Sequence, residues 1–451
     1  MSEAASAVSA SRPLIGRRLR EHFASTLYRN AYFLMLGTGA GAILGFVFWA
    51  LAARRYRPED VGVNSAVIAA MMLVSGASQL GLNGLLVRYL PSAGRSTRRL
   101  VLWTYLLTGS LSAVAALVAA LTSAGWSPRL AFLSENPRWL SAFVIATIAW
   151  TIFTLQDSVM TGMRQARWVP IENSLFAAAK LVLLVAVASV LPRSGIFLSW
   201  TVPVIISLIP VNALIFLRLI PGHVERAGVA SFELRRMMRF ASGNYLGTLF
   251  TLASTLFLPI LVTNESDARA TAYFFVPWTI AVAFQLVALN MTTSLTVEVA
   301  FDESRLRDYC RRVIVHTMRL VLPAALVLFV GAAYILRLFG PVYASQGATL
   351  LRVLVVGCIP NVIVVLGLSV ARIQHSGRRV LWIQGAQCVV TLGLSFVLLP
   401  QLGIDGIGIA WLVSQLTLAF WIALRILRPV FLVPVTAAIP ADPALEGSDG
   451  R

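Results

Sequence analysis

The stretch LPRSGI (Leu191–Ile196) ends one long apolar run and opens another, and LPQLGI (Leu399–Ile404) does the same 208 residues later. Downstream of each, an arginine-containing segment closes the second run. These segments are LRLIP (Leu217–Pro221) and LRILRP (Leu424–Pro429), which lie 207 residues apart. Matches at one offset and in the same order indicate that the chain contains an internal repeat.

Two further pairs keep this offset. Arg164 and Arg372 each follow an apolar run and are 208 residues apart, while Asp60 in RPEDVGVNSAV and Asp267 in ESDARATAYFF are 207 apart. Each copy then covers six apolar runs. Because six is an even number, both copies should have the same orientation and be related by an axis along the membrane normal. This arrangement predicts two lobes around a cavity, as in transporters that work by alternating access.

The composition is that of a membrane protein. Of the 451 residues, 58% are hydrophobic and 12% are charged, whereas soluble chains are about one quarter charged. An apolar run of about 20 residues is long enough to cross a bilayer as a helix. We predict an all-α polytopic membrane protein with about twelve transmembrane helices in two six-helix lobes. The predicted spans are 31–53, 63–88, 100–122, 139–161, 169–191, 196–218, 241–262, 271–296, 314–336, 350–371, 380–399 and 405–426.

These spans define five predicted regions. We expect a basic cytoplasmic arm over residues 1–30, an N-terminal six-helix lobe over 31–220 and a basic cytoplasmic linker over 221–240. A C-terminal six-helix lobe over 241–428 and a disordered cytoplasmic tail over 429–451 follow. The arm reads equally well as an amphipathic helix on the inner leaflet or as a disordered segment. No signal peptide is evident, and no loop is long enough to form a separate domain.

The charge distribution predicts the topology. The chain has a net charge of +18, and 36 of its 37 cationic side chains are arginines. Segments on the predicted N-terminal side carry 25 of them, against eight on the opposite side. Positive charge collects on the cytoplasmic side of membrane proteins, so both termini should be cytoplasmic. The same rule explains the basic composition without nucleic-acid binding.

Lys180 is the only lysine and lies in the apolar stretch LFAAAKLVLLVAV (Leu175–Val187). It follows Trp168 by twelve residues, which corresponds to a depth of about 18 Å. A lysine against lipid at the centre of a membrane costs about 2.5–3.5 kcal/mol on insertion scales. We therefore expect either a cation that faces a water-filled cavity or a structural ion pair with Asp157 or Glu172.

Four other charged side chains are candidates for function. Arg319 and Arg88 are secondary candidates for a cationic cavity, although each could equally lie at a membrane rim. Asp157 and Glu172, near the predicted inner surface, are candidates for ion coupling. The first span contains no acid, which disfavours a cation antiporter. The histidines lack the spacing of a metal site and no nucleotide-binding loop is present, so we expect no metal, no cofactor and no catalysis.

Three segments resemble the polysaccharide-biosynthesis flippases. FWALAARRYRPEDVGVNSAVIAAMMLVSGASQLGLNGLLVRYLP (Phe48–Pro91) is similar to their first helical hairpin, with a Pro-acidic-x-Gly turn and a Gly-Leu at the end of the second helix. LRLFGPVYASQGATLLRVL (Leu336–Leu354) and VLLPQLGIDGIGIAWLVSQ (Val397–Gln415) are similar to segments of their C-terminal half. The resemblance extends over about residues 25–428. The flippase family that it resembles belongs to the multidrug/oligosaccharidyl-lipid/polysaccharide superfamily.

The resemblance implies a function in surface polysaccharide biosynthesis. Such a flippase moves a polyprenyl-diphosphate-linked oligosaccharide from the cytoplasmic to the outer leaflet of a bacterial inner membrane. Its partners would be membrane lipids and the glycan polymerase or glycosyltransferases of the same pathway. Two alternatives stay open: a drug or metabolite cation antiporter of the same fold, and a membrane-embedded glycosyl transfer enzyme. The longest predicted outer loop, Ser123–Arg138, has one acid, which disfavours the enzyme.

Overall fold

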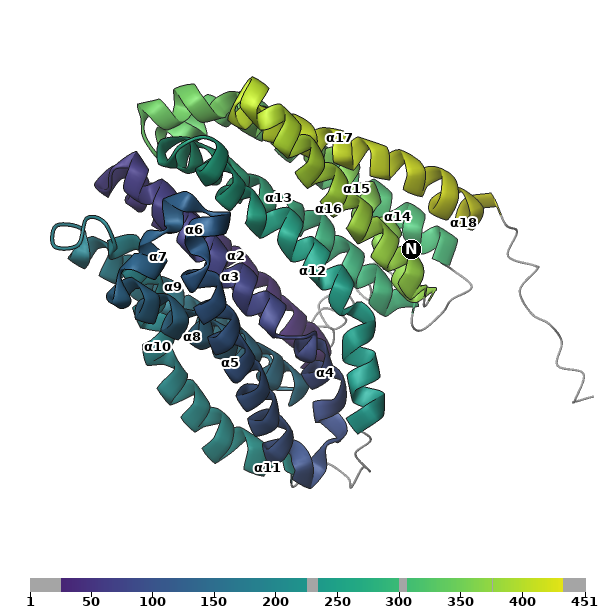
Figure 1. The fold of residues 1–451 in the computed structure, drawn as a ribbon. Helices are drawn as coiled ribbons and strands as arrows, with labels where there is room; N and C mark the ends of the chain where they lie inside the picture. The colour runs from purple at the N-terminus through teal and green to yellow at the C-terminus, as the bar shows by residue number, and fades with distance from the viewer. Residues whose placement is uncertain (1–25, 225–233, 300–305, 375, 433–451) are drawn as a thin grey trace, which may run out of the picture. The chain divides into compact units, whose positions relative to one another are not determined.

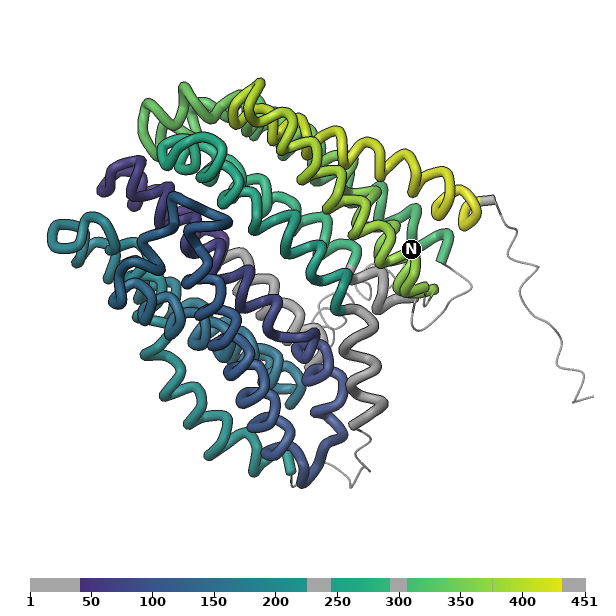
Figure 2. The backbone as a smooth tube through the Cα atoms, in the orientation of Figure 1, coloured from purple at the N-terminus to yellow at the C-terminus, as the bar shows by residue number. Residues whose placement is uncertain are grey.

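The computed structural model describes residues 26–224, 234–299, 306–374 and 376–432 (Figure 1 and Figure 2). Within these ranges, only the backbone is described for residues 26–40, 234–244 and 293–299. These residues form helices and turns and no β-strand. A chain that crosses a membrane must satisfy its own backbone groups, and helices do so within one segment. The predicted all-α class is confirmed. The arm as far as residue 25, part of the linker and the tail after residue 432 lie outside the described residues.

The first of two compact units comprises the chain up to Val276 together with Leu336–Gln346. Its long helices are α2 (Thr26–Arg55), α3 (Pro58–Ser78), α5 (Thr97–Leu121), α8 (Pro137–Gly162), α9 (Trp168–Val187), α10 (Gly195–Leu214) and α12 (Leu234–Glu265). Shorter helices are α4 (Leu82–Tyr89), α6 (Ser123–Trp126), α7 (Phe132–Glu135) and α11 (Ile220–Val224). This unit contains most of the candidate residues.

The second unit comprises Pro277–Ile335 and the chain from Gly347 onward. Its helices are the later part of α13 (Ala268–Val299), α14 (Leu306–Arg337), α15 (Pro341–Ile373), α16 (Gly377–Leu402), α17 (Ile404–Ile422) and α18 (Arg428–Leu432). α15 and α17 are held close together, because a Cβ on Gly408 would lie 2.8 Å from Leu350. Asn361 donates a hydrogen bond to Gln415 between the same two helices, at 3.1 Å. Small residues and interhelical hydrogen bonds are the usual means of packing helices in lipid.

α3 is the central helix of the first unit. Its sequence is rich in Ala, Ser and Gly, and buried residues occur on all of its faces. It packs against α5, α8, α10 and α12. A Cβ on Gly62 would lie 1.7 Å from the carbonyl oxygen of Ala268, so the starts of α3 and α13 are in backbone contact. These two starts are the equivalent segments around Asp60 and Asp267 in the sequence repeat.

All twelve predicted spans overlap with helices. Eleven helices within the described residues are long and apolar enough to cross a membrane, and α2 covers the first predicted span, 31–53. The predicted second span, 63–88, is wrong in one respect, because α3 ends at Ser78 and α4 begins at Leu82. Leu80 and Gly81 between them have φ angles of 52° and 72°. A helix cannot continue through the left-handed region that glycine favours.

The two repeats end in the same way. A π-helical turn follows α10 at Ile215–Leu219, and another follows α17 at Ala423–Leu427, 208 residues later. The short helices α11 and α18 come next, again 208 residues apart. π-Helical turns are rare, so two at matching positions support the internal repeat independently of the sequence matches.

Candidate functional site

Lys180 lies in an aromatic box made by Phe48 of α2, Phe176 of α9 and Trp200 of α10. Its ammonium nitrogen is 3.8 Å from the ring centroid of Trp200 and 4.9 Å from each of the two phenylalanine centroids. The side chain is 5% exposed. Cation–π contacts contribute about 0.5–1 kcal/mol at exposed sites and about 2 kcal/mol or more when desolvated. Three aromatic faces therefore replace part of the water that the ammonium loses.

The expected ion pair of Lys180 with Asp157 or Glu172 is wrong. Neither oxygen of Glu172 has a hydrogen-bond partner, and the Asp157 carboxylate accepts from Asn173 at 3.2 and 3.3 Å. Among the residues that the structure describes, no carboxylate forms a salt bridge with Lys180. The ammonium is therefore buried without a counter-ion, which is an electrostatically costly state.

The direction of the Lys180 side chain follows from a buried stripe on α9. Glu172, Phe176, Lys180 and Leu184 recur every four residues and are all buried. Positions four apart lie on one face of a helix. We expected this side chain to face a water-filled cavity. In the structure it is enclosed within the first unit, so contact with a substrate requires the aromatic box to open.

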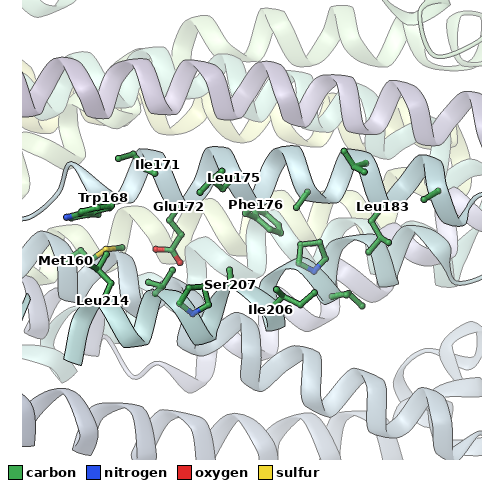
Figure 3. A pocket seen from close by; sticks show the side chains of 17 residues that line it. Met160, Trp168, Ile171, Glu172, Leu175, Phe176, Leu183, Ile206, Ser207 and Leu214 are labelled. Carbon is green, nitrogen blue, oxygen red and sulfur yellow. The ribbon is translucent and has the colours of Figure 1, made fainter. Parts of the chain in front are cut away.

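A groove runs between α9 and α10 and is lined in part by Phe176 (Figure 3). It has a volume of about 770 Å³. Its walls are almost entirely apolar, and the polar side chains in them are those of Glu172 and Ser207. Glu172 is 6% exposed, and its carboxylate points into this apolar surrounding. We call this feature the α9–α10 groove.

Asp157 and Glu172, the candidates for ion coupling, lie on the adjacent helices α8 and α9. They are not bonded to each other, since Asn173 holds Asp157 and Glu172 has no partner. The hydroxyl of Tyr105 on α5 is also buried without a partner. Within the described part of the chain, no group of three or more His, Cys, Asp or Glu side chains is arranged to hold a metal ion.

The two secondary candidate cations differ from Lys180, because both of them are exposed. Arg88 is exposed on α4, where its guanidinium carbon lies 5.8 Å from the ring centroid of Tyr89. Arg319 is exposed on α14 and belongs to the second unit. Both positions suit side chains at a membrane rim.

Sequence reasoning missed a set of polar contacts at one end of the first unit. Arg269 forms an ion pair with Glu59, and Arg54 donates to the carbonyl oxygen of Leu338 at 2.6 Å. Ser127 donates to the Asn264 side chain at 2.5 Å. We call these contacts the end network. They join segments of the first repeat to segments of the second at the end predicted to be outside. The partners of each contact are 137 to 284 residues apart, so no local pattern could have indicated them.

Residues 27–297 match the family model described as polysaccharide biosynthesis protein. This match covers more than half of the chain. The chain belongs to this polysaccharide biosynthesis family. No curated protein sequence matches it.

Solved structures that resemble this family member include transporters and a flippase. An inward-facing multidrug resistance transporter of the MATE family has a TM-score of 0.69 at 13% identity, with 86% of this chain and 94% of that chain covered. An outward-facing one has a TM-score of 0.64 at 14% identity, covering 90% and 96%. The lipid II flippase MurJ has a TM-score of 0.64 at 12% identity, covering 86% of each chain. At these identities the likeness shows the fold: the chain has the helical fold of these transporters and of this flippase.

Proposed function

We propose that the protein is a flippase that moves a polyprenyl-diphosphate-linked oligosaccharide from the cytoplasmic to the outer leaflet for surface polysaccharide biosynthesis. The match to the polysaccharide biosynthesis family over residues 27–297 carries this proposal. The buried ammonium of Lys180 supports it, because a cation without a counter-ion favours an anionic ligand. A diphosphate is the charge that every such substrate shares.

Translocation would proceed by alternating access of the two lobes. The end network supports this mechanism, because it joins both repeats at the end predicted to be outside. Opening toward that side requires these contacts to separate. In this scheme Lys180, Arg319 and Arg88 bind the diphosphate at successive stages, and Asp157 and Glu172 serve ion coupling. We infer that the protein catalyses no covalent step.

The proposed setting is a bacterial inner membrane with both termini in the cytoplasm. The excess of arginine in the segments on the N-terminal side supports this orientation. The substrate would come from glycosyltransferases on the cytoplasmic face and pass to a glycan polymerase on the other side. The domain limits 31–220 and 241–428 are proposed as the two halves of the sequence repeat.

Replacement of Lys180 tests the function. We expect Lys180→Ala to abolish flipping of a lipid-linked oligosaccharide in proteoliposomes, and Lys180→Arg to retain part of it because the charge remains. Arg352→Ala is the matched control, since this half-buried arginine in the second unit donates to the Phe329 carbonyl at 3.3 Å and has no proposed role. Wild-type flipping rates in Lys180→Ala would remove Lys180 from the mechanism. Absence of flipping by the wild-type protein would refute the proposed function.

One observation favours a drug or metabolite cation antiporter as the second candidate. The carboxylate of Glu172 lies without a partner in an apolar groove, which is a suitable setting for a lipophilic cation. The test is uptake of a lipophilic amine into energised proteoliposomes. This function would be selected over the first if Glu172→Gln abolished the uptake and the wild-type protein did not flip a lipid-linked oligosaccharide.

A further inference from the structure

The rims of the α9–α10 groove face outward. Leu175 and Val182 on α9 are 67% and 72% exposed, and Ile206 on α10 is 62% exposed. In a chain that spans a membrane, exposed apolar side chains of this kind contact the hydrocarbon of the bilayer. An occupant of the groove therefore enters from the lipid and is apolar over most of its length.

We propose that the α9–α10 groove holds the polyprenyl tail of the substrate while the headgroup crosses the membrane. This inference rests on the proposed function and adds a binding site for the part of the substrate that carries no charge. Three observations support the choice of a polyprenyl chain: the length of the groove, the charge at its mouth, and its distance from Lys180.

The groove is longer than one leaflet. Its wall on α9 runs from Trp168 to Ala186, about 27 Å at 1.5 Å per residue, and its wall on α10 runs from Val202 to Leu214, about 18 Å. One leaflet contributes about 15 Å of hydrocarbon. An ordinary acyl chain ends near the midplane and would leave the outer part of the groove empty. A polyprenyl chain is long enough to fill it.

The inner mouth of the groove is cationic. Arg164 and Arg167 lie four residues and one residue before Trp168, and Arg218 follows Leu214 by one helical turn. All three side chains are exposed. Arginine binds phosphate oxygens through paired N–H groups, which suits a diphosphate at the membrane surface. Glu172 lies one turn deeper, and a carboxylate there repels an anionic headgroup, so that the tail and not the diphosphate passes this point.

The groove is separated from Lys180 by one aromatic ring. Phe176 lines the groove and also lies 4.9 Å from the Lys180 ammonium. A tail held in the groove keeps the substrate beside Lys180, the one cation that is buried among the residues whose side chains the structure describes. A shift of the Phe176 ring would then couple occupation of the groove to opening of the aromatic box.

The test uses the full-length protein in nanodiscs and a long-chain polyprenyl diphosphate with a photoreactive group in its tail. We expect cross-links to the groove walls and at least about tenfold weaker binding by Ala179→Trp, because the indole fills the groove. Ala178→Trp is the matched control: Ala178 is the exposed neighbour on α9 that does not line the groove, and this variant should bind as wild type. Ala186→Trp should weaken binding of the long chain but not of a chain one leaflet long.

The outcomes separate this inference from the proposed function. Flipping by the wild-type protein and by Ala179→Trp at equal rates would overturn the groove as a tail site and leave the function intact. Cross-linking of the groove by photoreactive phosphatidylglycerol, with the polyprenyl probe labelling other helices, would also overturn it and identify a phospholipid site. Loss of binding in Ala179→Trp but not in Ala178→Trp would support it, with size-exclusion profiles verifying that both variants are folded.

Discussion

The contact between Gly62 and Ala268 gives a prediction whose size follows from the structure. In Gly62→Ala, the new Cβ would lie 1.7 Å from the Ala268 carbonyl oxygen and 2.7 Å from its carbon. Carbon–oxygen contacts are normally no closer than about 3.3 Å, so the two backbones must separate by about 1.6 Å. Overpacking of this kind costs about 1–3 kcal/mol. We expect the ratio of closed to open molecules at this end of the first unit to fall by about 5- to 150-fold.

The ion pair at the same place should matter less. Arg269 and Glu59 have side chains that are 64% and 40% exposed, and exposed pairs contribute about 0–1 kcal/mol. Glu59→Gln should therefore change the same equilibrium by less than about fivefold. Gly45→Ala on α2 is a control for the change of residue type, because a Cβ there has nothing within 4 Å.

The assay measures distances by electron paramagnetic resonance between spin labels on cysteines that replace Arg55 and Glu265. Both positions are exposed at this end of the first unit. We expect Gly62→Ala to populate longer distances, while Glu59→Gln and Gly45→Ala keep the wild-type distribution nearly unchanged. If Gly62→Ala gave the wild-type distribution, or if Glu59→Gln gave the larger shift, the reasoning that backbone contact dominates this interface would be refuted.

Two further predictions concern stability. Asn64 donates to the carbonyl oxygens of Asp60 and Arg193 and accepts from the amide of Phe197. Asn64→Ala should therefore lower the free energy of unfolding in detergent by about 1–3 kcal/mol, and an unchanged value would contradict this. Gly406→Ala would bring a Cβ to 2.5 Å from the Leu398 carbonyl and should lower the melting temperature, whereas Gly393→Ala meets no atom and should preserve or raise it.

Much of the fold could be predicted from the sequence, because a membrane interior allows few structures. Each apolar run had to form a helix, and the constant offset between LPRSGI and LPQLGI indicated two copies of one unit. The break after Ser78 was not predicted, although Gly81 belongs to the Gly-Leu pair at the end of the predicted second helix. Hydropathy does not change across a left-handed turn between two apolar helices, so an apolar run alone cannot reveal one.

The candidate site was harder to predict. The buried position of Lys180 could be recognised from its surroundings, but the side on which it points depends on helices α2 and α10, which are distant in sequence. Its aromatic partners Phe48 and Trp200 are 132 residues behind it and 20 ahead of it. Glu172 was assigned to an ion pair or an ion site. The groove that surrounds it arises from the packing of α9 and α10, which no pattern within either helix specifies.

The π-helical turns at Ile215–Leu219 and Ala423–Leu427 also record the history of the chain. A turn of this kind accommodates one residue more than an ordinary helical turn. Because the extra residue stands at the same point in both halves, we infer that the six-helix unit already contained it when the unit was duplicated.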